Sequence, residues 1–171
     1  FFHLSDLHIG KQLYHYNMMD ERRDILDQIV ELTKREQPDA VLIAGDIYDT
    51  PVPSAESVAL FDHFLTELNE IEPQVTVCMI AGNHDSAKRL DFASSILAKH
   101  RVVIAGMPPV TEEEHLEQVV FEDAYGEVAV YLLPFVKPSY VRGFGAEIGT
   151  YEDAVHFLIE REQIDPGKRN V

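Results

Sequence analysis

Three short apolar runs, each ending in a cluster of polar residues, constrain the fold of this chain more than any other feature. The runs are FFHLSDLH at 1–8, AVLIAGD at 40–46 and VTVCMIAGNH at 75–84. Their length and their content of β-branched and aromatic residues predict strands. Because helical patterns separate them, we expect right-handed crossovers and a largely parallel, buried sheet, typical of an α/β fold.

Apolar residues at helical spacing predict the helices that connect these strands. The first helix contains an i, i+4, i+7 row with two apolar neighbours beside it: Ile25, Ile29 and Leu32, then Leu26 and Val30. The second repeats four apolar residues after a Ser54 N-cap: Val58, Phe61, Leu65 and Leu68. Weaker periodicity predicts a third helix over 87–98, and RVVIAG at 101–106 then reads as a strand.

The rest of the chain is expected to add a hairpin and one more helix. QVVFED and EVAVYLLPF lie on either side of 124–126, which predicts a hairpin appended to the sheet. Thr150 and Asp153 resemble a capping box that opens a helix over 151–161.

Composition limits the functions that are open to the chain. Its 171 residues fit one domain of ordinary size, and no apolar run approaches the roughly 18 to 20 residues of a membrane span. The single Cys78 can form neither an internal disulfide nor a thiolate metal cluster, and it is compatible with a reducing, cytoplasmic setting. With a net charge of −16, the chain either does not bind polyanions, or binds them through metal ions and a few basic side chains, or relies on other segments or partners.

Carboxylate, imidazole and amide side chains stand at the carboxyl ends of the three predicted strands, where open α/β sheets bind ligands. They are Asp6 and His8, then Asp46 and Asp49, then Asn83, His84 and Asp85. Neighbouring parallel strands would bring these clusters together. Asp6 and His8 are two residues apart, so an extended backbone would point both side chains the same way. Gly45 and Gly82 predict a tight turn or a close backbone approach.

These donor types indicate the chemistry. Oxygen and nitrogen ligands without thiolate suit divalent manganese, iron or zinc. A central carboxylate can bridge two ions about 3.5 to 4 Å apart, an arrangement that clamps a phosphate ester and lowers the pKa of a bridging water. A nearby imidazole can assist the leaving oxygen. Each motif alone is common in ordinary turns, but the three together, in this order, favour a metal site over a purely structural interpretation.

The motifs D-x-H, G-D-x-x-D and G-N-H-D resemble the first three motifs of the calcineurin-like metallophosphoesterases. Four longer stretches are similar to the SbcD-type nuclease subunits of bacteria, which belong to that family: FFHLSDLHIGK, LIAGDIYDTPVPSAESV, GNHDSAKRLDFAS and YLLPFVKPSYVR. The resemblance covers residues 1 to about 141. It implies a four-layer α/β/β/α sandwich, incomplete here at its C-terminal end.

The resemblance also implies residue roles. The metal ligands would be Asp6, His8, Asp46 (bridging both ions) and Asn83. The catalytic imidazole would be His84, with Asp49 and Asp85 behind the ligands or near the phosphate. Candidate DNA contacts beside the motifs are Lys11, His15 and Arg89, and Tyr14 could stack on a base.

Cofactor and partners follow from the same resemblance. It implies two divalent metal ions, above all Mn²⁺, a DNA substrate with ends or hairpins, a homodimer and an ATPase partner of the SbcC type in DNA repair. The family completes its dimetal centre with a further His and a Gly-His-x-His motif, which nothing in 1–171 matches. We therefore expect the chain to be the first portion of the nuclease domain, without its later ligand motifs or its capping and partner-binding segments. By itself it would bind metal weakly and show little activity.

Three functions are compatible with these residues. The first is a metal-dependent DNA nuclease, which the segment SAKRLDFAS after the third motif favours. The second keeps the chemistry but acts on small nucleotides or other phosphate esters. The third is a non-catalytic scaffold whose metal site is vestigial.

Overall fold

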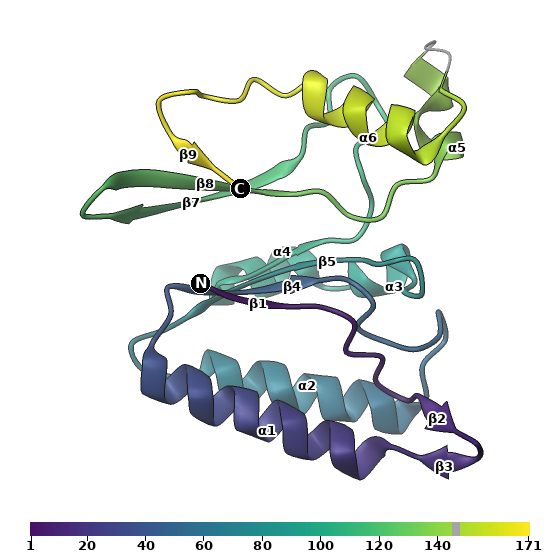
Figure 1. The fold of residues 1–171 in the computed structure, drawn as a ribbon, viewed down its shortest axis with the longest axis vertical. Helices are drawn as coiled ribbons and strands as arrows, with labels where there is room; N and C mark the ends of the chain where they lie inside the picture. The colour runs from purple at the N-terminus through teal and green to yellow at the C-terminus, as the bar shows by residue number, and fades with distance from the viewer. Residues whose placement is uncertain (145–147) are drawn as a thin grey trace. The chain divides into compact units, whose positions relative to one another are not determined.

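The computed structural model describes residues 1–144 and 148–171, which form two compact units, Phe1–Gly106 and Met107–Val171 (Figure 1). The first unit contains a sheet of four strands in the order β1-β4-β5-β6, and every pairing is parallel. The strands are β1 (Phe2–Leu4), β4 (Ala40–Ala44), β5 (Thr76–Ile80) and β6 (Val102–Ala105). The predicted parallel sheet is confirmed, with the strands in chain order.

Helices α1 (Met19–Glu36) and α2 (Ala55–Asn69) run side by side beneath one face of this sheet (Figure 1). The core lies between them and the sheet, and its largest fully buried side chains include Phe64, Leu60 and Met79. Ser54 caps α2 as predicted, because its hydroxyl accepts a hydrogen bond of 3.1 Å from the Ser57 N–H.

The face that α1 buries differs from the predicted one. Ile25 and Leu32 are 48% and 37% exposed. The buried row is instead Leu26, Val30 and Thr33, one residue further along the helix, and Thr33 satisfies its hydroxyl on the Ile29 carbonyl at 2.8 Å. Two apolar rows lie side by side on this helix, and packing on α2 and the sheet selects between them.

The predicted third helix is broken. It consists of α3 (Ala87–Leu90), α4 (Ser94–Leu97) and the 3₁₀ turn η1 (Ala98–His100). Ala93, with φ of 62°, takes the left-handed conformation between the first two and ends helical continuity there. Leu90 and Leu97 nevertheless pack against the core of the first unit.

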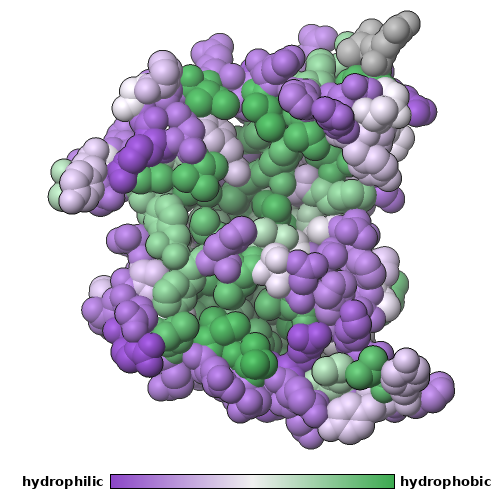
Figure 2. All heavy atoms as spheres, viewed as in Figure 1, coloured by the Kyte–Doolittle hydropathy of each residue, from purple (hydrophilic) through white to green (hydrophobic). Residues whose placement is uncertain are grey.

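A small hairpin that the sequence did not predict precedes α1. Its strands are β2 (Gln12–Leu13) and β3 (Tyr16–Asn17), and its tip residues Tyr14 and His15 have φ of 48° and 70°. Tyr14 is 95% exposed, and Leu13 and Tyr16 are also exposed. Figure 2 shows hydrophobic and near-neutral side chains at this corner of the surface, at the lower right.

The second unit has its own three-stranded sheet, β7-β8-β9. The predicted hairpin is present as β7 (Glu117–Asp123) and β8 (Gly126–Leu132), but it is not hydrogen-bonded to the first sheet. In the described residues the hairpin belongs to a separate sheet, in which the other edge of β8 pairs in parallel with β9 (Arg169–Asn170).

Short helices complete the second unit: α5 (Pro138–Val141), the 3₁₀ turn η2 (Arg142–Phe144) and α6 (Tyr151–Glu160). The capping box that opens α6 is confirmed, because Thr150 and Asp153 exchange hydrogen bonds between side chain and backbone. Val141, Ala154 and Leu158 lie at the centre of a small apolar cluster. Across the described residues, no helix combines the length and the apolar character needed to cross a bilayer.

Truncation of Phe64 to alanine tests the core of the first unit. Phe64 is 2% exposed beneath the sheet, so Phe64→Ala is expected to lower the free energy of unfolding by about 3–5 kcal/mol. Its exposed neighbour His63 provides the matched control, and His63→Ala is expected to change stability by less than about 0.5 kcal/mol. Chemical denaturation followed by circular dichroism measures both. Equal effects would contradict this core.

Candidate metal centre

The first two polar clusters are held together by backbone pairing that continues beyond the strands. The N–H of Asp6 donates to the Gly45 carbonyl at 3.2 Å, and the N–H of His8 donates to the Asp46 carbonyl at 2.9 Å. Ile9 continues the series on Ile47 at 2.9 Å. The loops after β1 and β4 therefore stay in register, and their side chains converge as the spacing of the motifs predicted.

Asp6, His8 and Asp46 all have left-handed backbone conformations, with φ of 56°, 43° and 50°. The prediction that an extended backbone aligns Asp6 with His8 is therefore wrong, because β1 ends at Leu4 and both residues lie in a tight loop. Non-glycine residues occupy this region at a cost of about 1–3 kcal/mol each, and such residues concentrate at functional sites.

Two glycines let the second and third loops touch. A Cβ on Gly45, whose φ is 84°, would lie 2.8 Å from the Gly82 Cα. A Cβ on Gly82 would lie 2.0 Å from Asp46 Oδ1 and 2.3 Å from the Asp46 nitrogen. The predicted close approach is confirmed, and it presses the Asp46 carboxylate against the backbone of the G-N-H-D loop.

Asp46 is the junction of the three motifs. Its Oδ1 accepts a hydrogen bond of 3.0 Å from the N–H of His84, and its Oδ2 lies 3.8 Å from His8 Nε2. The same His8 nitrogen is 3.7 Å from Asp6 Oδ1, while the Ser5 hydroxyl donates to the other Asp6 oxygen. Donor atoms of Asp6, His8 and Asp46 all lie within 4.8 Å of one another, a spacing that fits a divalent cation.

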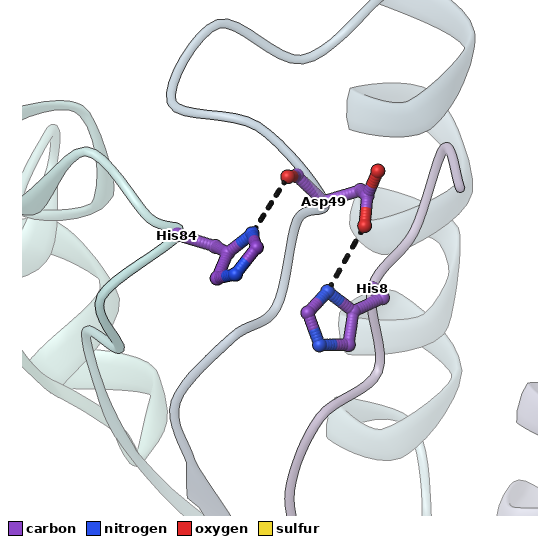
Figure 3. Close-up of side chains that lie close together, drawn as sticks. All are labelled: His8, Asp49 and His84. Carbon is purple, nitrogen blue, oxygen red and sulfur yellow. Dashed lines mark hydrogen bonds and ion pairs between the residues drawn. The ribbon is translucent and has the colours of Figure 1, made fainter. Parts of the chain in front are cut away.

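His8, Asp49 and His84 form a second cluster that shares His8 with the first (Figure 3). His84 Nδ1 is 2.9 Å from the Asp49 carbonyl oxygen, and His8 Nδ1 is 3.1 Å from Asp49 Oδ1. The two rings meet edge to face with their centroids 4.9 Å apart. The first cluster offers carboxylate and imidazole donors at the spacing of a divalent ion, and the second cluster places Asp49 and His84 directly beside it.

The surroundings of His84 favour its protonated form. Its hydrogen bond to the Asp49 carbonyl raises the pKa of the imidazole, and the negative charges of Asp46 and Asp49 add to this effect. Partial desolvation and the positive charge of Lys11 oppose it.

Asp85 ties the second loop to the third. Its carboxylate accepts three backbone N–H groups, from Gly82 at 2.8 Å, Tyr48 at 3.0 Å and Ile47 at 3.2 Å. Beside it, burial is the main reason that the pKa of Tyr48 rises to about 12, and the charge of Asp85 contributes. The structure thus places Asp85 behind the loops, where it holds the position of Asp46.

The remaining predicted residues lie around this cluster. Asn83 is exposed and lies between Gly82 and His84 in the third loop. His15 is at the tip of the β2–β3 hairpin, and Arg89 is exposed on α3. The contact of Asp49 with His8 had no signal in the sequence, since D-x-H and G-D-x-x-D carry no information on which side chains meet.

The sequence matches the family of the calcineurin-like phosphoesterases over residues 1–151. The chain belongs to this family. It is 32% identical to the SbcD subunit of the nuclease SbcCD from Staphylococcus epidermidis and 31% identical to that from Staphylococcus saprophyticus subsp. saprophyticus, in both cases over 99% of this chain.

The alignment covers 44% of each relative, so the chain spans less than half the length of the curated relatives it matches. Calcineurin-like phosphoesterases imply divalent metal ions, and the paired clusters around His8 fit that requirement.

Gly82→Ala tests the contact between the loops. The added methyl group would overlap Asp46, so we expect a loss of about 1–3 kcal/mol in stability and a roughly tenfold weaker affinity for Mn²⁺. Gly143→Ala is the matched control, since its Cβ would meet nothing within 4 Å. Thermal denaturation and isothermal titration with Mn²⁺ measure the two effects. An unchanged Mn²⁺ affinity in Gly82→Ala would contradict the role of this contact.

Proposed function

We propose that this chain carries the metal-binding core of an Mn²⁺-dependent DNA nuclease that hydrolyses phosphodiesters. The observation that carries the proposal is the position of Asp46, whose carboxylate contacts His84 and lies close to His8. The names of the two staphylococcal relatives support a nuclease rather than an enzyme for small phosphate esters.

In this proposal Asp6 and His8 bind one ion, Asn83 binds the other, and Asp46 binds both. When bound, the ions supply a water of lowered pKa and neutralise charge on the phosphate. These protein side chains hold the donors in place, so that the phosphodiester meets a preorganised site.

His84 is proposed to act on the leaving oxygen. Its Nδ1 faces the Asp49 carbonyl, which accepts a hydrogen bond and so directs the proton of that nitrogen inward. The other nitrogen, Nε2, remains to hold or transfer a proton, and the side chain is exposed to an incoming substrate. An imidazole titrates close to neutral pH, which suits a general acid.

DNA would be held by local contacts. Lys11 is proposed as a phosphate contact, because its charge reaches His84. His15 and Arg89 extend the candidate surface on either side, and the exposed Tyr14 can stack on an unpaired base. A net charge of −16 makes such local contacts necessary, since the overall field repels DNA.

The complete centre is proposed to need donors from outside 1–171. Four direct ligands are too few for two ions that together prefer about ten to twelve. We infer further histidine ligands in a later part of the nuclease domain, and reading the gene for a Gly-His-x-His motif after residue 171 tests this point.

The partners are part of the same proposal. We infer an SbcC-type ATPase as partner from the resemblance to SbcD-type subunits, which the name SbcCD of the two relatives supports, and a cytoplasmic location is part of the same proposal. A homodimer is proposed through exposed apolar side chains such as Val58 on α2 and Phe92 after α3, which line one groove of the first unit.

The nuclease activity can be tested with His84→Ala in the natural full-length protein. We expect cleavage of hairpin DNA with Mn²⁺ to fall by about 100- to 10,000-fold, because a proton donor is lost. Mn²⁺ affinity is expected to stay within a few fold, since His84 is proposed to face the leaving group. His63→Ala on α2 is the control. Turnover of small diesters without any cleavage of DNA would refute the nuclease, and no turnover of either by the wild-type protein would favour the scaffold.

Metal binding can be tested independently of cleavage. Mn²⁺ at 100 times its dissociation constant is expected to stabilise the protein by about 2.7 kcal/mol, and EDTA should reverse the effect. Asp46→Asn should abolish most of this stabilisation, because the central carboxylate is lost. Asp27→Asn, on the exposed side of α1, removes the same charge and should respond like wild type. Identical Mn²⁺ responses of the two variants would argue against a site at Asp46.

A further inference from the structure

The segment between the third motif and β6 is positively charged in a strongly acidic chain. Residues 87–101 carry four basic side chains, Lys88, Arg89, Lys99 and Arg101, against one acid, Asp91, which gives a net charge of +3 where the whole chain has −16. All four basic side chains are exposed. Within residues 1–144 and 148–171, none of them forms an ion pair or a side-chain hydrogen bond. No direct partner therefore neutralises their charge.

Hydrogen bonds anchor both parts of this segment to the sheet. The Asp91 carboxylate accepts a hydrogen bond of 2.8 Å from the Gly106 N–H, directly after the carboxyl end of β6. At the other end, the Arg101 carbonyl accepts a hydrogen bond of 2.9 Å from the Val77 N–H of β5. The backbone that carries the basic side chains is therefore fixed, and the single acid of the segment is used to fix it.

The four basic side chains form two pairs at opposite ends of the sheet. Because β5 and β6 are parallel, the segment that joins them must return along the sheet (Figure 1). Lys88 and Arg89 on α3 lie at the carboxyl end, soon after the G-N-H-D loop. Lys99 and Arg101 lie at the amino end, where η1 leads into β6. β5 has five residues, so at a rise of about 3.3 Å per residue the pairs are roughly 15 Å apart.

We propose that residues 87–101 form a further DNA-binding surface, which contacts the phosphate backbone of a strand beyond the nucleotides at the metal centre. Exposed lysine and arginine side chains bind phosphates without reading sequence, and each such contact releases counterions from the nucleic acid. A strand that leaves the metal centre meets the pair on α3 first and then Lys99 and Arg101. The proposal rests on the proposed nuclease function, because only a polymeric substrate is long enough to reach both pairs.

Lys99 and Arg101 give the cleaner test, because acidic side chains line the groove beside the other pair. The variants are Lys99→Gln, Arg101→Gln and their combination in the natural full-length protein. Arg23→Gln is the matched control, since Arg23 is also exposed and lies beside Asp24 on the acidic helix α1. Thermal denaturation confirms that each variant is folded.

Two DNA probes of different length report binding in the presence of Mn²⁺. The first is a labelled phosphorothioate single strand, which resists cleavage, and fluorescence anisotropy measures its affinity at increasing salt concentration. The second is a phosphorothioate dinucleotide, which is too short to reach from the metal centre to Lys99, and isothermal titration measures its affinity.

We expect Lys99→Gln and Arg101→Gln to weaken binding of the long strand at low salt. Each loses one phosphate contact, so the slope of log affinity against log salt concentration should become shallower by about 0.7, and by about 1.4 in the double variant. Arg23→Gln should keep the wild-type slope. The affinity for the dinucleotide should equal that of the wild-type protein in all these variants.

Three results would overturn the proposal. The first is a wild-type slope in the double variant, and the second is an equal change in Arg23→Gln. The third is altered self-association at unchanged DNA affinity, read by analytical ultracentrifugation, which would make this surface a contact between two copies of the chain.

Cleavage of unmodified hairpin DNA judges the nuclease separately. Cleavage by the wild-type protein, together with a wild-type slope in the double variant, would refute only the further surface. Binding of the long strand through Lys99 and Arg101 without any cleavage would refute only the nuclease.

Discussion

The contact between the Asp46 carboxylate and the loop of His84 is the constraint on which the rest of the site depends. It exists because Gly82 has no side chain to keep the loops apart, and because Asp85 binds three backbone N–H groups on the two sides. Once Asp46 is fixed, the backbone bonds from Asp6 and His8 align the first loop with it. The glycine contact and the backbone hydrogen bonds therefore fix the position of the Asp46 carboxylate first. The positions of the His8 and His84 imidazoles depend on it.

Because the backbone positions these side chains, the candidate ligands can keep unfavourable backbone angles. Asp6, His8 and Asp46 are left-handed residues in loops whose N–H groups are already paired across the sheet edge. The backbone hydrogen bonds between the loops hold these residues in their unfavourable conformations. The positions of the side chains therefore depend mainly on the backbone. Polar groups that are placed in this way can meet a cation or a phosphate with little reorganisation.

The sequence predicted those features that are decided locally or by chain order. The parallel sheet, the Ser54 cap, the Thr150 capping box and the glycine contact follow from propensity, capping chemistry and βα alternation. It failed where tertiary packing chooses between nearly equal local options, as with the two apolar rows of α1. The prediction also failed where a single residue takes the left-handed conformation. Ala93 interrupts the third helix in this way, and Asp6 and His8 turn the first loop, but none of the three is a glycine that would have indicated a turn.

The negative charges of the candidate site would couple the binding of metal ions to the binding of a phosphodiester substrate. Asp6, Asp46 and Asp49 gather their charges around His8, in a chain that already carries a net charge of −16. A phosphodiester that approaches this cluster is repelled, and Lys11 near His84 offsets only one charge. In the proposed site, cations bound among the carboxylates would reverse the sign of the local field. By linkage, a substrate phosphate must then strengthen metal binding by the same factor by which the metal strengthens substrate binding. An acidic surface is therefore compatible with a nucleic-acid substrate when the positive charge is supplied by the ions.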